Sequence, residues 1–129
     1  MTLLSQFLCL LAVHWFADFV LQTHWQAQNK SKNNEALARH VVVYTTVLAI
    51  AMVAIFEPFN TLADRRSATV FVAINGILHF LTDYLTSRWS SRLYVKQDWH
   101  NFFVVIGLDQ LVHQFTLAGT MILFLGSHT

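Results

Sequence analysis

The sequence is poor in charged residues, and it contains a single cysteine and a single proline. Only 12% of its 129 residues are Asp, Glu, Lys or Arg, which is half of the share of about 25% in soluble domains. So few charges cannot cover a small water-soluble domain, because its surface is large relative to its volume. The shortage of charge also argues against a disordered chain and against a coiled coil.

The lone cysteine and the balanced charge argue against two further classes of protein. Cys9 has no second cysteine with which to form an internal disulfide, so a secreted disulfide scaffold is not expected. The formal net charge is +1 with histidine neutral, and no strongly basic surface therefore indicates a nucleic-acid partner.

Long apolar stretches are what the sequence has instead. Hydrophobic residues make up 55% of it, and the mean hydropathy is +0.47. Four stretches are close to the length of about 20 residues that a helix needs to cross a bilayer, and they do not alternate as the strands of a membrane barrel do. They cover approximately residues 3–22, 39–56, 68–86 and 101–125. We therefore predict an all-α integral membrane protein, a four-helix bundle that forms one domain over residues 1–129.

The first apolar stretch is expected to remain as a helix rather than to be removed as a signal peptide. No Lys or Arg precedes it, and Asp18 lies inside it. A signal peptide would have a positively charged start and an apolar centre.

The cationic residues gather at two of the three predicted connections. The first and third connections, Thr23–Ala38 and Ser87–His100, hold or border six Lys and Arg residues, whereas Glu57–Ser67 holds two. The six are Lys30, Lys32, Arg39, Arg88, Arg92 and Lys96. The positive-inside rule then predicts that this side faces the cytoplasm and that both termini lie outside it. The cations could serve topology alone, or Lys30, Lys32, Arg88 and Arg92 could attract an anionic headgroup or a phosphate-bearing substrate.

Three of the four predicted spans contain a pair of ionisable residues. The pairs are His14 with Asp18, His79 with Asp83, and Asp109 with His113. Each pair has i, i+4 spacing, so its two side chains lie on one face of a helix. An ionisable group at such depth costs several kcal/mol unless it is paired, hydrated or bound to an ion.

The three pairs are expected at similar depths in the cytoplasmic leaflet. At about 1.5 Å per residue, Asp18 and Asp83 lie roughly 6 Å from the cytoplasmic ends of their helices. One turn deeper, at roughly 12 Å, come His14, His79 and Asp109, and His113 lies one turn beyond these. His40 opens the second span on the same side. The economical interpretation is a single polar cavity open to the cytoplasm.

An internal repeat supports this arrangement. The segments His14–Val20 and His79–Leu85 both read His-aromatic-x-x-Asp-aromatic-aliphatic, and they begin about half a chain length apart. Two helical hairpins in the same orientation could therefore be related by an axis along the membrane normal. The repeat predicts that the helix face with His14 and Asp18 and the helix face with His79 and Asp83 point towards each other across the bundle.

Imidazole and carboxylate groups together suit a divalent transition metal, of which zinc is the expected one. We expect the direct ligands to come from His14, His79, Asp109 and His113. The carboxylates of Asp18 and Asp83 would act as bridging ligands or as general bases, and His40 would complete the ligand set or donate a proton to a leaving group. The number of candidates leaves room for two metal ions, or for carboxylates that only orient the histidines.

The polar motifs together resemble those of a known family. His14-x-x-x-Asp18-Phe19-x-x-Gln22, His40-x-x-x-Tyr44, His79-x-x-x-Asp83-Tyr84 and Asp109-Gln110-x-x-His113 resemble the bacterial and phage domain of unknown function numbered 3307. The resemblance covers nearly the whole chain. It implies four spans, a bacterial or phage inner membrane and motifs that act as one unit, and it supplies no reaction.

Three functions fit the sequence, and whether the protein is an enzyme stays open. The leading hypothesis is a zinc-type membrane hydrolase that acts on a lipid or a lipid-linked phosphate at the cytoplasmic leaflet. The second is a divalent-metal or proton transporter, which needs access from both sides of the membrane. The third is a membrane interaction protein whose His and Asp residues only fix helix packing. Transport would require an oligomer, because four helices can barely enclose a channel.

Overall fold

The structure, a computed structural model, describes residues 2–55 and 61–125 and is helical throughout, apart from short connections. The helices are α1 (Leu3–Trp15), the π-helical turn η1 (Phe16–Val20), α2 (His24–Asn29), α3 (Asn34–Ile55), α4 (Leu62–Val95) and α5 (Trp99–Leu125). The described residues include no strand. The predicted all-α class is confirmed.

Threonine residues fix where three of the helices begin. The Thr2 side chain accepts a hydrogen bond from the Ser5 backbone at the start of α1. Capping boxes open α2 and α4, through Thr23 with Gln26 and Thr61 with Asp64. In each box the threonine oxygen and the side chain three residues later satisfy backbone N–H groups that the first turn of a helix leaves free.

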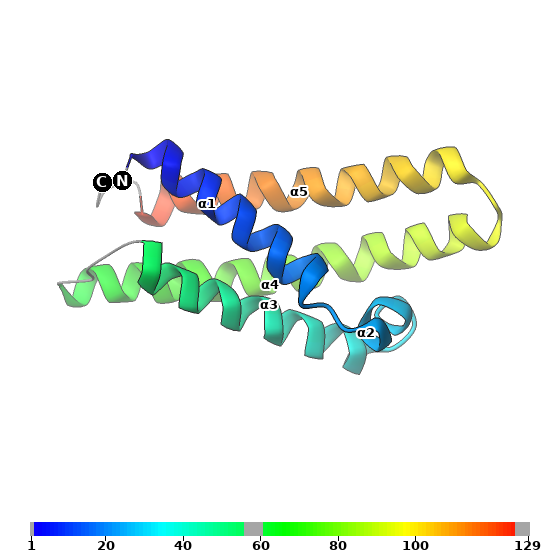
Figure 1. The fold of residues 1–129 in the computed structure, drawn as a ribbon, viewed down its shortest axis with the longest axis horizontal. Helices are drawn as coiled ribbons and strands as arrows, with labels where there is room; N and C mark the ends of the chain where they lie inside the picture. Colours follow the sequence, from blue (N-terminus) through cyan, green and yellow to red (C-terminus); the bar gives the residue numbers. More distant parts are fainter. Residues whose placement is uncertain (1, 56–60, 126–129) are drawn as a thin grey trace.

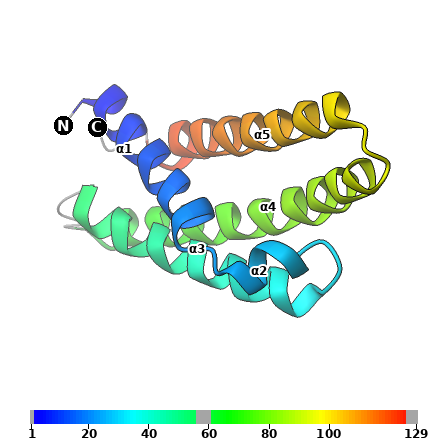
Figure 2. The ribbon, with the colours of Figure 1, turned by 45° about the vertical axis from the view of Figure 1, so that its right-hand side comes forward.

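The long helices form a bundle in which α1 and α4 run in the same direction and α3 and α5 run in the opposite one (Figure 1). The start of α1 and the end of α5 lie together at one end, which we call the terminal end. Figure 2 shows α2 at the other end, beside the beginning of α3. We call this the α2 end. α3 packs against both α1 and α4, and α5 packs against the same two helices from the other side, so α1 and α4 face each other diagonally.

The outer surface of the bundle is apolar, as expected of a surface in contact with lipid. Four helices are long and apolar enough to cross a membrane, over Leu3–Val20, Asn34–Ile55, Asp64–Val95 and Trp99–Leu125. Large apolar side chains such as Ile50, Leu85, Phe115 and Leu123 are 65 to 75% exposed. So much exposed apolar surface is incompatible with water as the only solvent. The predicted membrane four-helix bundle is confirmed.

Two helices are longer than their predicted spans. α3 begins at Asn34 and α4 continues to Val95, so most of the predicted connection Ser87–His100 is helical. Only residues 96–98 join α4 to α5, with Gln97 at a positive φ of 56°. The run of apolar residues ends where contact with lipid would end. The helix continues beyond that point, because polar side chains can face water while the backbone stays helical. Part of the predicted connection Glu57–Ser67 lies outside the described residues.

The interior of the bundle has an apolar half at the terminal end. Its core includes the fully buried side chains of Leu10, Leu48, Phe71, Leu117 and Met121. One turn or more towards the α2 end, on the same four helices, the buried side chains become ionisable. The core therefore positions a polar cluster nearer to the α2 end and separates it from the terminal end.

Close packing of α3 against α4 depends on Gly76. A Cβ atom at this position would lie 2.7 Å from Thr45 Oγ1 and 3.3 Å from Thr45 Cγ2. Gly107 and Gly119 have no such neighbour within 4 Å in the described part of the chain. Small residues let helices approach in membranes, and of these three glycines only Gly76 has that role.

Candidate metal centre

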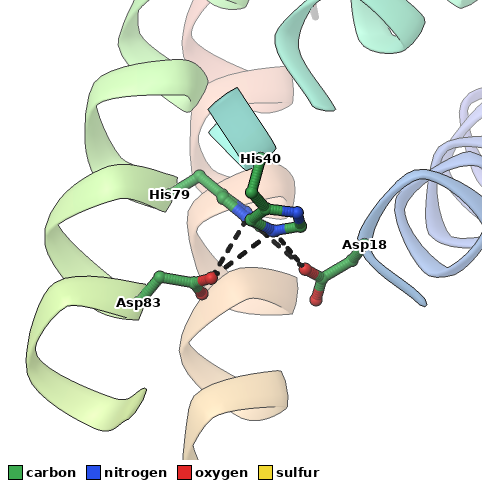
Figure 3. Close-up of side chains that lie close together, drawn as sticks. All are labelled: Asp18, His40, His79 and Asp83. Atoms are coloured by element: carbon green, nitrogen blue, oxygen red, sulfur yellow. Dashed lines mark hydrogen bonds and ion pairs between the residues drawn. The ribbon is translucent and has the colours of Figure 1, made fainter. Parts of the chain in front are cut away.

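Four buried side chains from three segments of the chain converge beneath the α2 end (Figure 3). Asp18 comes from η1, His40 from α3, and His79 and Asp83 come from α4. None of the four is more than 2% exposed. In Figure 3 the two carboxylates lie on either side of the two imidazole rings, and all four groups point inwards. The predicted meeting of the His-Asp faces across the bundle is confirmed by the 3.5 Å between His79 Nε2 and Asp18 Oδ1.

Five of the six distances between the four donor atoms lie between 3.0 and 3.7 Å, close to those around a tetrahedral metal ion. His40 Nε2 lies 3.0 Å from Asp18 Oδ1, 3.1 Å from His79 Nε2 and 3.5 Å from Asp83 Oδ2. His79 Nε2 lies 3.5 Å from Asp18 Oδ1 and 3.7 Å from Asp83 Oδ2. Zinc-to-ligand distances of about 2.0–2.2 Å imply tetrahedral edges of about 3.3–3.6 Å. The cluster could therefore hold a metal ion with little movement of its side chains.

Local helix geometry gives each donor its position. On α4, His79 and Asp83 lie one turn apart on the same face. Asp18 lies in η1, where the Leu21 N–H donates to the Phe16 carbonyl five residues earlier. Such π-helical turns change the direction of a side chain and recur at functional sites. The Tyr44 ring stacks on His79 at 3.9 Å between centroids and holds the plane of that imidazole.

Two buried carboxylates at this depth require positive charge nearby. Lys30, the C-cap residue of α2, donates a hydrogen bond from Nζ to Asp83 Oδ2 at 2.9 Å. Burial acts to lower the pKa of Lys30, but the carboxylates of Asp83 and Asp18 outweigh it and raise that pKa above its ordinary value. Lys30 therefore carries its charge at neutral pH and offsets part of the negative charge of the cluster.

Asp83 also belongs to a second group of possible ligands, together with Asp109 and His113 of α5. His113 Nε2 lies 3.5 Å from Asp83 Oδ1, and His113 Nδ1 lies 2.8 Å from the Asp109 carbonyl oxygen. The Asp109 carboxylate accepts hydrogen bonds from the Thr86 hydroxyl and, at 3.0 Å, from Gln110 Nε2. The two groups thus share one carboxylate and form a continuous site.

The structure brings together most of the residues that the sequence singled out. Of the direct ligands expected, His79 lies in the first group, and Asp109 and His113 lie in the second. His14 belongs to neither group, although its Nε2 lies 3.7 Å from Asp18 Oδ2. His40 is one of the four donors of the first group, and its Nε2 lies 3.0 to 3.5 Å from a donor atom of each of the other three.

Several contacts that support the cluster were not predicted from the sequence. Gln110 Nε2 of α5 donates to Asp18 Oδ2 of η1 at 3.3 Å as well as to Asp109. The ion pair between Lys30 and Asp83 was not foreseen, because no spacing relates two residues so far apart in the sequence. Thr86 was also missed, but its position one turn from Asp83 towards the α2 end was a usable signal.

A pocket of about 610 Å³ adjoins the cluster at the α2 end. Asp83 and Asp109 line it, so it reaches both groups of donors. One part of its wall carries Lys30 and Lys32, together with hydroxyl groups of α4 such as Ser90. Another part is apolar or aromatic, with Tyr94, Phe102 and Ile106. A ligand with an anionic part and an apolar part would fit such a wall.

Comparison with known proteins identifies the family of the chain. Neither the curated proteins nor the solved structures gave a match. A family model described as "Protein of unknown function (DUF3307)" matches residues 6–128, which include every donor of the cluster. The chain belongs to the DUF3307 family.

Proposed function

We propose that this protein is a metal-dependent hydrolase of the membrane, which acts on a lipid or a lipid-linked phosphate at the cytoplasmic leaflet. The observation that carries the proposal is the set of four buried donors, which lie close enough together to hold one metal ion, next to a cation-lined pocket. Zinc is the metal we expect, because two imidazoles and two carboxylates are ligands that it accepts. Asp18, His40, His79 and Asp83 are the proposed ligands.

The reaction we propose is hydrolysis of a phosphoester. A bound divalent ion lowers the pKa of a water molecule and so supplies a nucleophile at neutral pH. The water oxygen forms a bond to phosphorus while the bond from phosphorus to the lipid oxygen breaks. Asp18 Oδ2, which accepts a hydrogen bond of 3.3 Å from Gln110 Nε2 and lies 3.7 Å from His14 Nε2, would take the proton from water and return it to the leaving oxygen.

The pocket supports an amphipathic phosphate as substrate. Lys30 and Lys32 offer positive charge beside Asp83 and would hold the phosphate near the metal. Three other side chains that line the pocket, Tyr94, Phe102 and Ile106, offer apolar surface for the first carbons of a lipid. Because the pocket and most of the Lys and Arg residues lie at the same end of the bundle, the positive-inside rule supports the cytoplasmic leaflet.

Transport across the membrane is less well supported by the arrangement of the core. A transporter needs a path to each side, whereas Leu10, Leu48, Phe71 and Met121 fill the bundle between the cluster and the terminal end. The pocket opens at the α2 end. Chemistry at one face of the membrane fits this asymmetry better.

The proposal is tested with purified protein in lipid nanodiscs, loaded with Zn²⁺ or Mn²⁺ and given a panel of phospholipids and polyprenyl phosphates. We expect release of phosphate or of a headgroup from at least one of them, and a loss of at least about a hundredfold in His79→Ala, the effect of removing a metal-bound nucleophile. His100→Ala is the matched control, because His100 is exposed and lies outside both groups of donors. A blank panel for protein that holds its metal would overturn the proposal.

A further inference from the structure

We infer that the protein binds two divalent cations, with Asp83 bridging a second metal site formed with His113 and Asp109. The sequence was compatible with a second ion but did not place it. In the structure, three residues that could bind a second ion lie close together. Its proposed role as the ion that faces the substrate rests on the proposed function above. Its existence does not.

The hydrogen bonds of His113 define which of its nitrogens is free. Nδ1 lies 2.8 Å from the Asp109 carbonyl oxygen, and because a carbonyl oxygen can only accept, Nδ1 must carry the proton. In the neutral ring Nε2 then has an unprotonated lone pair. A histidine that donates one N–H to a backbone carbonyl and points the other nitrogen inwards has the arrangement usual for metal ligands.

Two buried acceptors face one another at this point. His113 Nε2 and Asp83 Oδ1 are 3.5 Å apart, and each side chain is at least 98% buried. Neither atom has a hydrogen-bond partner among residues 2–55 and 61–125. Leaving such groups unsatisfied inside a protein costs about 1–3 kcal/mol each. A cation between them would satisfy both atoms at once.

A proton on His113 Nε2 explains the geometry less well. A charged N–H···O bond to a carboxylate measures about 2.7–2.9 Å, and the separation here is 3.5 Å. By contrast, two ligands of one ion, each about 2.1 Å from it, lie about 3.0–3.5 Å apart in octahedral or tetrahedral geometry. The separation therefore fits two ligands of one metal ion.

Asp109 would complete the protein ligands of the second ion. Its carboxylate belongs to the same group of possible ligands as Asp83 and His113, with Oδ2 3.6 Å from His113 Nδ1, and Thr86 and Gln110 hold it in place. Asp109 also lines the pocket and is 16% exposed through its side chain. Three protein ligands beside a pocket leave coordination positions for water and substrate, as in catalytic metal sites.

The two ions would divide the work of the site. The first ion has four protein ligands, so it would bind the attacking water only as a fifth ligand. The second ion has three and opens to the pocket. Because Asp83 offers Oδ2 to the first group and Oδ1 to the second, one carboxylate would hold the two ions at the separation of about 3.5–4 Å found in two-metal hydrolytic sites.

The test is metal stoichiometry of the full-length protein in detergent, reconstituted with Mn²⁺ and freed of unbound ion. We expect two Mn²⁺ per chain in the wild type and in His100→Ala, and one in His113→Ala. Electron paramagnetic resonance of the wild type should show an exchange-coupled signal from two neighbouring ions, a readout that needs no variant to fold. One Mn²⁺ per chain in the wild type, with the six-line signal of an isolated ion, would overturn the inference.

The outcome is separable from that of the proposed function. Two coupled Mn²⁺ ions in a protein that hydrolyses none of the lipid panel would support the second site and overturn the hydrolase. Hydrolysis by a protein that binds a single ion would support the hydrolase and overturn the second metal site. Both readings use the same wild-type preparation.

Discussion

Lys30 and Asp83, which are 53 residues apart in the sequence, are joined by a hydrogen bond of 2.9 Å between Nζ and Oδ2. The bond fastens the segment that carries α2 to the middle of α4 and covers the polar cluster from the α2 end. The Lys30 side chain is 19% exposed and that of Asp83 is 1% exposed, so this contact lies where the interior meets solvent.

Replacing Lys30 with methionine should strengthen metal binding. The ammonium group repels a divalent ion held by Asp83, and removing one such charge several ångströms away should lower Kd by about tenfold. Metal-free Lys30→Met should be less stable than the wild type, because its buried carboxylates lose a compensating charge. Isothermal titration with Zn²⁺ measures the first effect and thermal unfolding of metal-free protein measures the second.

Lys32→Met is the matched control for this substitution. Lys32 lines the same pocket, but the described residues give it no ion pair with a carboxylate of the cluster. Its Kd for Zn²⁺ should change less than that of Lys30→Met. Weaker binding in Lys30→Met than in Lys32→Met would contradict the expectation.

Metal should stabilise the fold and its removal should destabilise it. An ion that binds only the folded state contributes about 2.7 kcal/mol when its free concentration is a hundred times Kd. The thermal midpoint of the wild type should therefore rise with Zn²⁺ and fall with a chelator. In Asp18→Asn the response should be much smaller, since one of the four donors of the first group is weakened. A midpoint in the wild type that ignores both additions would speak against the site.

The start of α5 should make stability depend on pH in acid. Asp98 accepts hydrogen bonds from the Asn101 side chain and backbone, at 2.7 and 3.3 Å. These bonds hold the pKa of Asp98 below its ordinary value. The contribution is present above the unfolded-state pKa of about 3.8–3.9 and is lost as the pH falls through the lower, folded-state pKa.

Comparison of Asp98→Ala with Asp98→Asn separates the charge of this residue from its role as a cap. Asp98→Ala should be less stable than the wild type at pH 6, and the difference should shrink as Asp98 becomes protonated near pH 3. Asp98→Asn keeps a good capping residue and should lie between the two at pH 6. Thermal unfolding across this pH range measures both. A difference between Asp98→Ala and the wild type that grows towards pH 3 would be the contrary result.

Gly76 should tolerate a large side chain much less well than Gly119. Gly76→Leu would insert its Cβ against Thr45 and should cost about 1–3 kcal/mol, as overpacked cores do. Gly119→Leu meets no described atom within 4 Å of its Cβ and should be neutral or slightly stabilising, since leucine favours helix more than glycine does. Unfolding in detergent compares the two, and equal stability would refute the packing argument.

The four helices could be predicted because apolar runs and span length are local properties of the sequence. Their ends could not, because the apolar pattern reports contact with lipid and not the extent of the helix. α4 illustrates this: Arg88 and Arg92 end the apolar run, but the backbone stays helical to Val95. The π-helical turn at Phe16–Val20 also has no signature that the sequence pattern could reveal.

The sequence could predict which residues form the candidate site, but not how their side chains are arranged in space. The i, i+4 pairs identified His79 with Asp83 and Asp109 with His113, since one helix face brings each pair together. Which pairs from different helices meet depends on how the helices rotate and cross. That is why His40, expected to complete the ligand set or to donate a proton, is one of the four close donors of the first group, whereas His14, expected as a direct ligand, belongs to neither group.

The apolar half of the core has a consequence for how the cluster meets its surroundings. Leu10, Leu48, Phe71 and Met121 close the way from the terminal end, and a hydrated ion does not cross such a layer. Ions bound at the cluster would exchange with one aqueous compartment alone. In a living cell, the metal occupancy of the cluster would then depend on the free-metal concentration in that compartment and not on the concentration on the opposite side of the membrane.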